Sequence, residues 1–174
     1  VGKFSKTENV VLNVLPHQGK VPPIYVAVLA REAAYHVGKQ GNQLFTVPYA
    51  SCKDFSDIGT MFQEFRRGRA EANLPAQDDD HVFVLHTHVA ESDAACAAEC
   101  KSPYDLYVET RLYAKKHVYE DIIANGICLF GGVETVAEKM CRLHEMGIRH
   151  VAILNNFGAL APEIVERSMQ RFAR

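Results

Sequence analysis

The chain has 174 residues, 48% of them hydrophobic, which is enough to bury a sizeable core as a single domain over residues 1–174. Its 19 Lys and Arg against 21 Asp and Glu give a net charge of −2, so no basic surface typical of nucleic-acid or anionic-membrane binding is expected. No apolar run approaches the roughly 20 residues that a membrane-spanning helix needs. These properties favour a small-molecule ligand.

The five cysteines are Cys52, Cys96, Cys100, Cys128 and Cys141. Their number is odd, and no two are spaced as a CxxC pair. The first residues lack the charged and then apolar pattern of a signal peptide. We therefore expect reduced thiols in a cytoplasmic protein.

Residues 1–23 contain a short apolar run and then a connector rich in Pro and Gly that cannot continue a helix or a central strand, which predicts an entry segment. Ile24–Leu29 is continuously apolar, as is typical of a strand covered on both faces in a parallel sheet. A helix is predicted over Arg31–Gln40 and ends before Gly41. A short second strand is predicted over Leu44–Val47.

An amphipathic helix is then predicted by four apolar residues at helical spacing, namely Ile58, Met61, Phe62 and Phe65. The strongest strand pattern follows at Val82–Val89, where alternate residues belong to opposite faces. The bulkier apolar face suits packing under helices, so His86 and His88 are expected to point inward. We expect Val82, Val84 and Val26 to lie open on the inner face unless a second half covers them.

Further helices are predicted over Ser92–Lys101, Tyr104–Asn125, Glu134–Met146 and Pro162–Ala173. A last strand is predicted over Val151–Leu154. Strands and helices alternate, which favours a parallel α/β arrangement. Because a closed (β/α) barrel needs eight strands and about 250 residues, the four predicted strands amount to about half of one.

Ligands of parallel α/β folds bind at the carboxyl ends of the strands. At the end of the first strand, the N–H groups of the next helix and the Arg31 side chain make a candidate anion site; the alternative is a solvated helix start without a ligand. Asn155 ends the last strand, where its amide either bonds a ligand or caps a turn. Gly131 and Gly132 suggest either a loose phosphate loop or a tight turn.

His86 is the strongest candidate for chemistry, because an inward histidine with a pKa near neutrality can transfer protons. The alternative is a core histidine with satisfied hydrogen bonds. His86 and His88 have the spacing of two metal ligands, but no third ligand stands at a diagnostic spacing, so no metal site is predicted. Tyr107 and Arg111 are candidates for lining a substrate mouth, with helix packing as the alternative.

Four segments, in this order, resemble the C-terminal half of luciferase-like, flavin-dependent monooxygenases: "PPIYVA", "LHTHVAES", "FGGVETVAEKM" and "GIRHVAILNNFGALAPEIVERSMQRFA". The resemblance implies an α/β fold of the (β/α)8 TIM-barrel type, with this chain supplying strands five to eight. It implies an enzyme that uses reduced FMN, or a related deazaflavin, to activate oxygen or transfer hydride to a small organic substrate.

Within this resemblance, the residues expected to bind the cofactor are Leu29, Ala30, Arg31, Glu32 and Asn155. His86 is expected to be catalytic, and the residues expected to contact the substrate are His88, Tyr107 and Arg111. Many members have a Ser-rich turn where this chain has Leu29, Ala30 and Arg31, so phosphate binding would rest on backbone N–H groups and Arg31.

The resemblance also implies a flavin reductase as a partner, and pairing either as a dimer or with a missing barrel half. A non-catalytic module is the alternative function. It would be a degenerate flavin-binding half or a structural half-barrel, and it is favoured by the missing serines and the missing strands.

Overall fold

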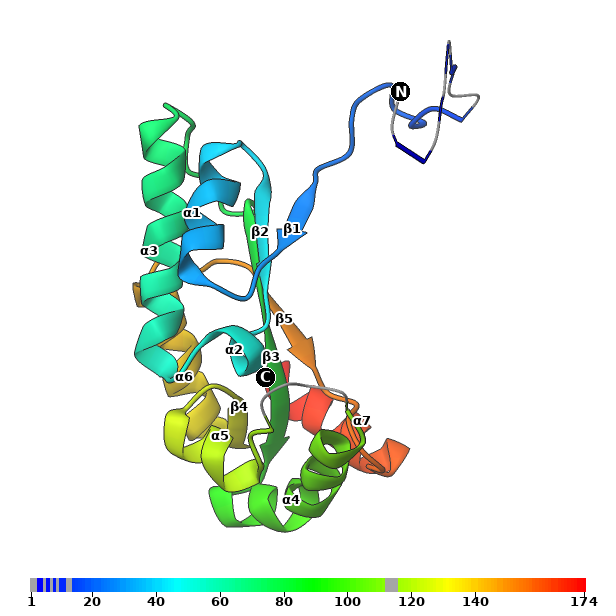
Figure 1. Ribbon diagram of the computed structural model, residues 1–174. Coiled ribbons are helices and arrows are strands. Elements are labelled where there is room, and N and C mark those ends of the chain that lie inside the picture. The colour runs from blue at the N-terminus through cyan, green and yellow to red at the C-terminus, as the bar shows by residue number, and fades with distance from the viewer. Residues whose placement is uncertain (1–2, 5, 7, 9, 12–13, 112–115) are drawn as a thin grey trace.

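The computed structural model describes residues 3–4, 6, 8, 10–11, 14–111 and 116–174. The strands are β1 (Tyr25–Ala27), β2 (Gln43–Thr46), β3 (His81–Ala90), β4 (Leu129–Gly132) and β5 (Val151–Leu154). The helices are α1 (Arg31–Lys39), α2 (Pro48–Ser51), α3 (Phe55–Glu71), α4 (Asp93–Thr110), α5 (Tyr119–Asn125), α6 (Val133–Glu145) and α7 (Pro162–Phe172). Residues 14–24 are exposed and lead away from the sheet (Figure 1).

The four strands predicted from the sequence pair side by side in chain order, all parallel. β1 pairs with β2, β2 with β3, and β3 with β5. This is the order of consecutive strands in a (β/α) barrel, and α1 and α3 lie together on one side of it (Figure 1). The predicted parallel half-barrel is confirmed.

A fifth strand, β4, was not expected from the sequence. It pairs with the far end of β3, from Thr87 opposite Leu129 to Ala90 opposite Gly132. Gly131 and Gly132 end this extended segment directly before α6, as the tight-turn prediction expected. A segment of 4 residues with two glycines has little strand pattern of its own. Its backbone pairs because β3 runs for 10 residues, well past the end of β2.

On the edge of β3 that pairs with β5, a side chain provides the last hydrogen-bond acceptor. The N–H of Phe83 donates to the carbonyl oxygen of His150 at 3.2 Å, on the edge that β5 occupies. Since alternate N–H groups of a strand point to the same edge, the N–H of Val89 points the same way, beyond the end of β5. There it donates to the Oγ of Ser168 on α7 at 2.8 Å. Ser168 therefore ties α7 to the carboxyl end of β3.

Replacing Ser168 by Ala should lower the free energy of unfolding by roughly 1–3 kcal/mol, because it leaves the buried N–H of Val89 without an acceptor. Urea unfolding of the whole chain measures this. Ser102→Ala, at an exposed position on α4, is the matched control and should change stability by less than about 0.5 kcal/mol. Equal stabilities for the two variants would show that Val89 finds another acceptor.

Two glycines allow α1 and α3 to approach closely. A Cβ on Gly38 would lie 2.2 Å from the carbonyl oxygen of Phe65, and one on Gly68 would lie 2.1 Å from that of Tyr35. Each glycine therefore admits the backbone of the opposite helix. This contact fixes α1, whose first turn starts at the carboxyl end of β1.

The two faces of the sheet differ in exposure. Val26 is aligned with Leu44, which is fully buried, so both point toward the helices. The expectation that Val26 lies open on the inner face is wrong, because the register places Tyr25 and Ala27 there instead, and both are exposed. Val82 does share the inner face but is only 8% exposed, so that expectation is also wrong.

Val84 is half-buried, and so are its β5 neighbours on the inner face, Ala152 and Leu154. Leu29, just beyond β1, is 68% exposed. The prediction of a first strand covered on both faces is therefore wrong, because no part of the described chain covers the inner face of β1. An apolar face remains partly open on the inside of the half-barrel.

The predicted helices at Ser92–Lys101 and Tyr104–Asn125 are arranged differently. α4 continues through Pro103 to Thr110, because its buried residues form one continuous stripe: Cys96, Cys100, Tyr104, Tyr107 and Val108. Packing of that stripe outweighs the loss of one backbone hydrogen bond at the proline. Residues 112–115 of the second predicted helix lie outside the described residues, and α5 begins only at Tyr119.

The thiols of all five cysteines are free, four of them buried and Cys141 exposed. Among the helices of the described residues, none is long and apolar enough to cross a membrane.

Candidate active site

His86 lies on the inner face of β3, toward its carboxyl end, and is only 2% exposed. Four aromatic rings surround its imidazole, and we call them the His86 cage. The centroid distances from His86 are 5.4 Å to Tyr49, 5.4 Å to Tyr104, 5.3 Å to Tyr107 and 6.2 Å to Phe157. All four meet the imidazole edge to face, the arrangement that aromatic quadrupoles favour.

The cage is assembled from distant parts of the chain. Tyr104 and Tyr107 are one turn apart on α4, Tyr49 is on α2 just after β2, and Phe157 follows β5. Sequence reasoning found Tyr107 but missed the other three. The rule that functional residues follow parallel strands would have pointed to Tyr49 and Phe157, each three residues beyond a strand.

The cage controls the charge of His86. Burial lowers its pKa to about 4, and the positive charge of Arg111 adds to the effect. The guanidinium of Arg111 lies over the ring of Tyr107, 4.6 Å from its centroid. The expectation of a histidine with a pKa near neutrality is therefore wrong: His86 is neutral at pH 7. Its buried Nε2 has no hydrogen-bond partner among the described residues.

This depressed pKa predicts a pH dependence of stability. Between pH 4 and 6.5 the unfolded chain protonates His86 and the folded chain does not, so the stability of the fold falls as pH is lowered through that range. The contribution amounts to about 3 kcal/mol. The difference in unfolding free energy between the wild type and His86→Leu should therefore shift by that amount from pH 7 to pH 4. The exposed-site variant His144→Gln is the control, and its difference from the wild type should show no such shift. If the difference for His86→Leu is the same at pH 7 and pH 4, the imidazole of His86 becomes charged in the folded state.

His88 is fully buried and is not part of the cage. Its Nε2 pairs with Oε2 of Glu99 on α4 at 2.8 Å, and its carbonyl oxygen accepts a hydrogen bond from the thiol of Cys96 at 3.4 Å. These contacts hold α4 against β3. No group of three metal-binding side chains occurs in the parts of the chain that the structure describes.

The start of α1 forms an exposed, uncapped helix terminus at the carboxyl end of β1. The N-cap residue Ala30 offers no side-chain hydrogen bond, and Leu29 before it is largely exposed. Arg31 supplies a positive charge, partly balanced by Asp57 at 3.7 Å and by Glu32 in the same turn. Backbone N–H groups and one guanidinium are thus available to an anion.

Asn155 follows β5 directly and is half-buried. Its buried Oδ1 has no donor among the described residues. Like Nε2 of His86 and Nδ1 of His88, it is a buried polar atom without a partner among the described residues toward the carboxyl end of a strand.

The start of α6 does not offer a second anion site, because Asp93 already fills it. Oδ1 of Asp93 accepts the N–H of Gly132 at 2.7 Å, and Oδ2 accepts the hydroxyl of Thr135 at 3.1 Å. These hydrogen bonds hold the pKa of Asp93 below its usual value. The carboxylate takes the position that a phosphate would need.

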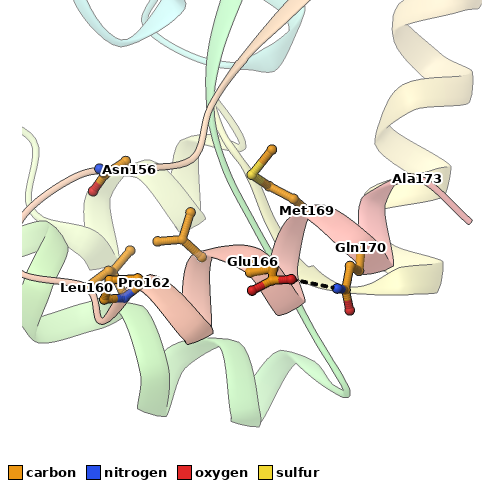
Figure 2. Close-up of a pocket in the computed structure, with 8 residues that line it drawn as sticks. Asn156, Leu160, Pro162, Glu166, Met169, Gln170 and Ala173 are labelled. Carbon is orange, nitrogen blue, oxygen red and sulfur yellow. Dashed lines mark hydrogen bonds between the residues drawn. The ribbon is translucent and has the colours of Figure 1, made fainter.

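A groove of about 550 Å³ runs along the outer side of α7, beside Asn156 (Figure 2). Its lining is mostly apolar, and two of its lining residues, Glu166 and Gln170, are joined by a hydrogen bond from the Gln170 amide at 3.1 Å. No cation lines it within the described chain. It is therefore poorly suited to a phosphate or a carboxylate.

Parallel strands in barrel order, with aromatic and polar side chains gathered at their carboxyl ends, define half of a (β/α)8 barrel. Residues 1–150 match the family of luciferase-like monooxygenases, so the chain belongs to that family. A search of curated proteins finds no match.

Solved structures agree on the fold. Monooxygenase RslO1 from Streptomyces bottropensis is 18% identical with a TM-score of 0.72, over 91% of this chain and 49% of that one. The oxygenating constituent of 3,6-diketocamphane monooxygenase from Pseudomonas putida, solved with FMN, is 17% identical with a TM-score of 0.73, over 91% and 49%. An F420-dependent secondary alcohol dehydrogenase is 17% identical with a TM-score of 0.60, over 88% and 48%. The chain thus spans about half the length of these proteins.

Proposed function

We propose that this chain forms part of a flavin-dependent monooxygenase that acts on a small organic substrate with reduced FMN and oxygen. The observation that carries the proposal is the His86 cage, a neutral imidazole with an unpartnered Nε2 among aromatic rings at the carboxyl end of a barrel strand. A bound reduced flavin would supply the electrons with which oxygen is activated. A flavin reductase would supply that reduced flavin.

The residues fit a flavin at two points. The start of α1 and Arg31 suit the phosphate, with Leu29, Ala30 and Glu32 beside it, although none of these three adds a hydroxyl donor. The unpartnered Oδ1 of Asn155 suits an N–H of the flavin ring. A deazaflavin is the alternative cofactor, since two structural neighbours are described as F420-dependent.

His86 is proposed to act as a hydrogen-bonding group and not to gain or lose a proton during turnover. A neutral imidazole in a desolvated cage can hold a carbonyl or hydroxyl oxygen in one position. Tyr107 and Arg111 would border the substrate on the α4 side. His88 would act indirectly, because its contact with Glu99 holds α4, and with it Tyr107 and Arg111, against β3.

The inner face of the half-barrel is open, which favours a second half of the barrel that covers it. Tyr25, Ala27 and Leu29 are exposed there, and the free edges of β1 and β5 are unpaired within the described residues. We propose that the site is completed by the other half of a barrel, supplied either by a longer chain or by a second copy. Size measurement by ultracentrifugation distinguishes a monomer from a dimer of the 174-residue chain.

Arg31→Gln should weaken FMN binding roughly tenfold, since it removes a charge-assisted contact to the phosphate. Binding is followed by quenching of flavin fluorescence. Riboflavin, which lacks the phosphate, is the matched ligand and should bind both proteins equally. Arg67→Gln, an exposed arginine on α3, is the matched variant and should leave FMN affinity unchanged. An equal loss for FMN and riboflavin would place the phosphate elsewhere.

A non-catalytic flavin-binding or structural module is the second candidate, favoured by the absence of hydroxyl groups at Leu29 and Ala30. Flavin binding without oxygen uptake, in a complete barrel supplied with NADH and a reductase, would support it. Oxygen consumption that depends on an added substrate would exclude it.

A further inference from the structure

A second cavity, of about 370 Å³, lies between α6 and α7 on the opposite side of α7 from the groove in Figure 2. Its apolar walls include Val89 at the end of β3, Val136 and Met140 on α6, and Phe172 on α7. A volume of this size falls in the range of small-molecule sites. It is separate from the His86 cage, none of whose residues lines it.

Two arginine side chains and no acidic side chain line the cavity. Arg171 and Arg174 are its charged lining residues, and neither Asp nor Glu lines it within the described chain. This contrasts with the groove on the other side of α7, where Glu166 is the charged residue. Among the residues that the structure describes, the lining of this cavity complements an anion and that of the groove does not.

The guanidinium of Arg171 is incompletely satisfied. Its Nη2 contacts Oε1 of Glu91 at 3.1 Å, while its buried Nη1 has no partner among the described residues. The side chain of Glu91 is 82% exposed, so its displacement into water costs little. A carboxylate in its place can engage both Nη atoms of the fork at once.

We propose that this cavity binds a small amphiphilic carboxylate, its apolar chain between α6 and α7 and its head group on Arg171. The apolar walls account for the chain, and the arginine accounts for the sign of the head group. The site is distinct from that of the proposed monooxygenase reaction, and its test does not require flavin or turnover.

Cys141 provides the readout, because it lines the cavity and is the exposed cysteine of the five. The probe is decanoate, and decanol, with the same chain and no charge, is the matched ligand. The rate of Cys141 alkylation by iodoacetamide on the folded 174-residue chain is followed by mass spectrometry. Decanoate should slow alkylation at a concentration roughly tenfold lower than decanol.

Arg171→Gln should raise the decanoate concentration needed for protection roughly tenfold and leave that of decanol unchanged. Arg167→Gln, an exposed arginine on the same helix, should alter neither. Ala137→Phe is a second variant, at an exposed lining position, and should abolish protection by both ligands by filling the cavity. Equal potency of decanoate and decanol, or undiminished protection in either Arg171→Gln or Ala137→Phe, would overturn the proposal.

Discussion

His86→Leu, in a complete barrel that contains this chain, should lower turnover by roughly 10²–10³-fold, the usual cost of losing one hydrogen-bonding group from a desolvated site. Leucine keeps the apolar volume, so the four rings of the cage have a similar surface to pack against. His86→Asn retains a donor and an acceptor and should lose much less activity. The difference between the two variants measures the hydrogen bond.

The pH profile separates this role from acid–base catalysis. Burial lowers the pKa of His86 to about 4, so the pH profile of turnover should show no inflection near pH 6.5 that depends on His86. The wild type and His86→Asn should therefore have the same profile around that pH. An inflection that depends on His86 would mean that His86 exchanges protons in the assembled site. A pure packing role predicts instead that both variants melt earlier and keep normal specific activity in the folded fraction.

Asp80→Asn should destabilise the fold by roughly 3–5 kcal/mol, because it removes the carboxylate that balances a buried arginine. Asp80 is fully buried just before β3. Its Oδ2 accepts from Nη1 of Arg66 at 2.5 Å and contacts Nε of Arg69 at 3.1 Å. Arg69 is only 7% exposed, so it would be left without a compensating charge.

The same carboxylate fixes a core histidine. Oδ1 of Asp80 lies 2.9 Å from Nδ1 of His81, whose Nε2 accepts the N–H of Arg149 at 2.9 Å. With Nε2 accepting, Nδ1 carries the proton and donates a hydrogen bond to Oδ1 of Asp80, so both ring nitrogens of His81 are satisfied. This network joins α3, β3 and the start of β5.

Urea unfolding at pH 7 measures the effect, and Asp79→Asn, at the exposed neighbouring position, is the matched control. Burial alone would raise the pKa of Asp80, but hydrogen bonds from His81, the N–H of Gln77 and Arg66 outweigh it and lower the pKa. The stabilisation is thus complete above the ordinary carboxyl pKa of about 4 and is lost as pH falls below it. A loss at pH 7 no larger than that of Asp79→Asn would show that the arginines find other acceptors.

The sequence by itself determined the class of fold, because that depends on patterns within short stretches. Alternation along Val82–Val89 and the continuous apolar run around Val26 identify strands, while glycines at 41 and 126 mark helix ends, where φ is positive in the structure. Four strands linked by helices then imply a parallel half-barrel. The alternation also placed His86 on the inner face correctly.

Only the tertiary structure decided the rest, because it depends on contacts between residues far apart in the chain. The register of β1 against β2 set which face Val26 occupies, and β4 exists only because β3 extends far enough to pair with it. The cage brings Tyr49, Tyr104 and Phe157 to His86, and their exclusion of water, not the local sequence, lowers the pKa of the imidazole. Burial of this kind is a property of the packed molecule, so no local pattern in the sequence could predict it.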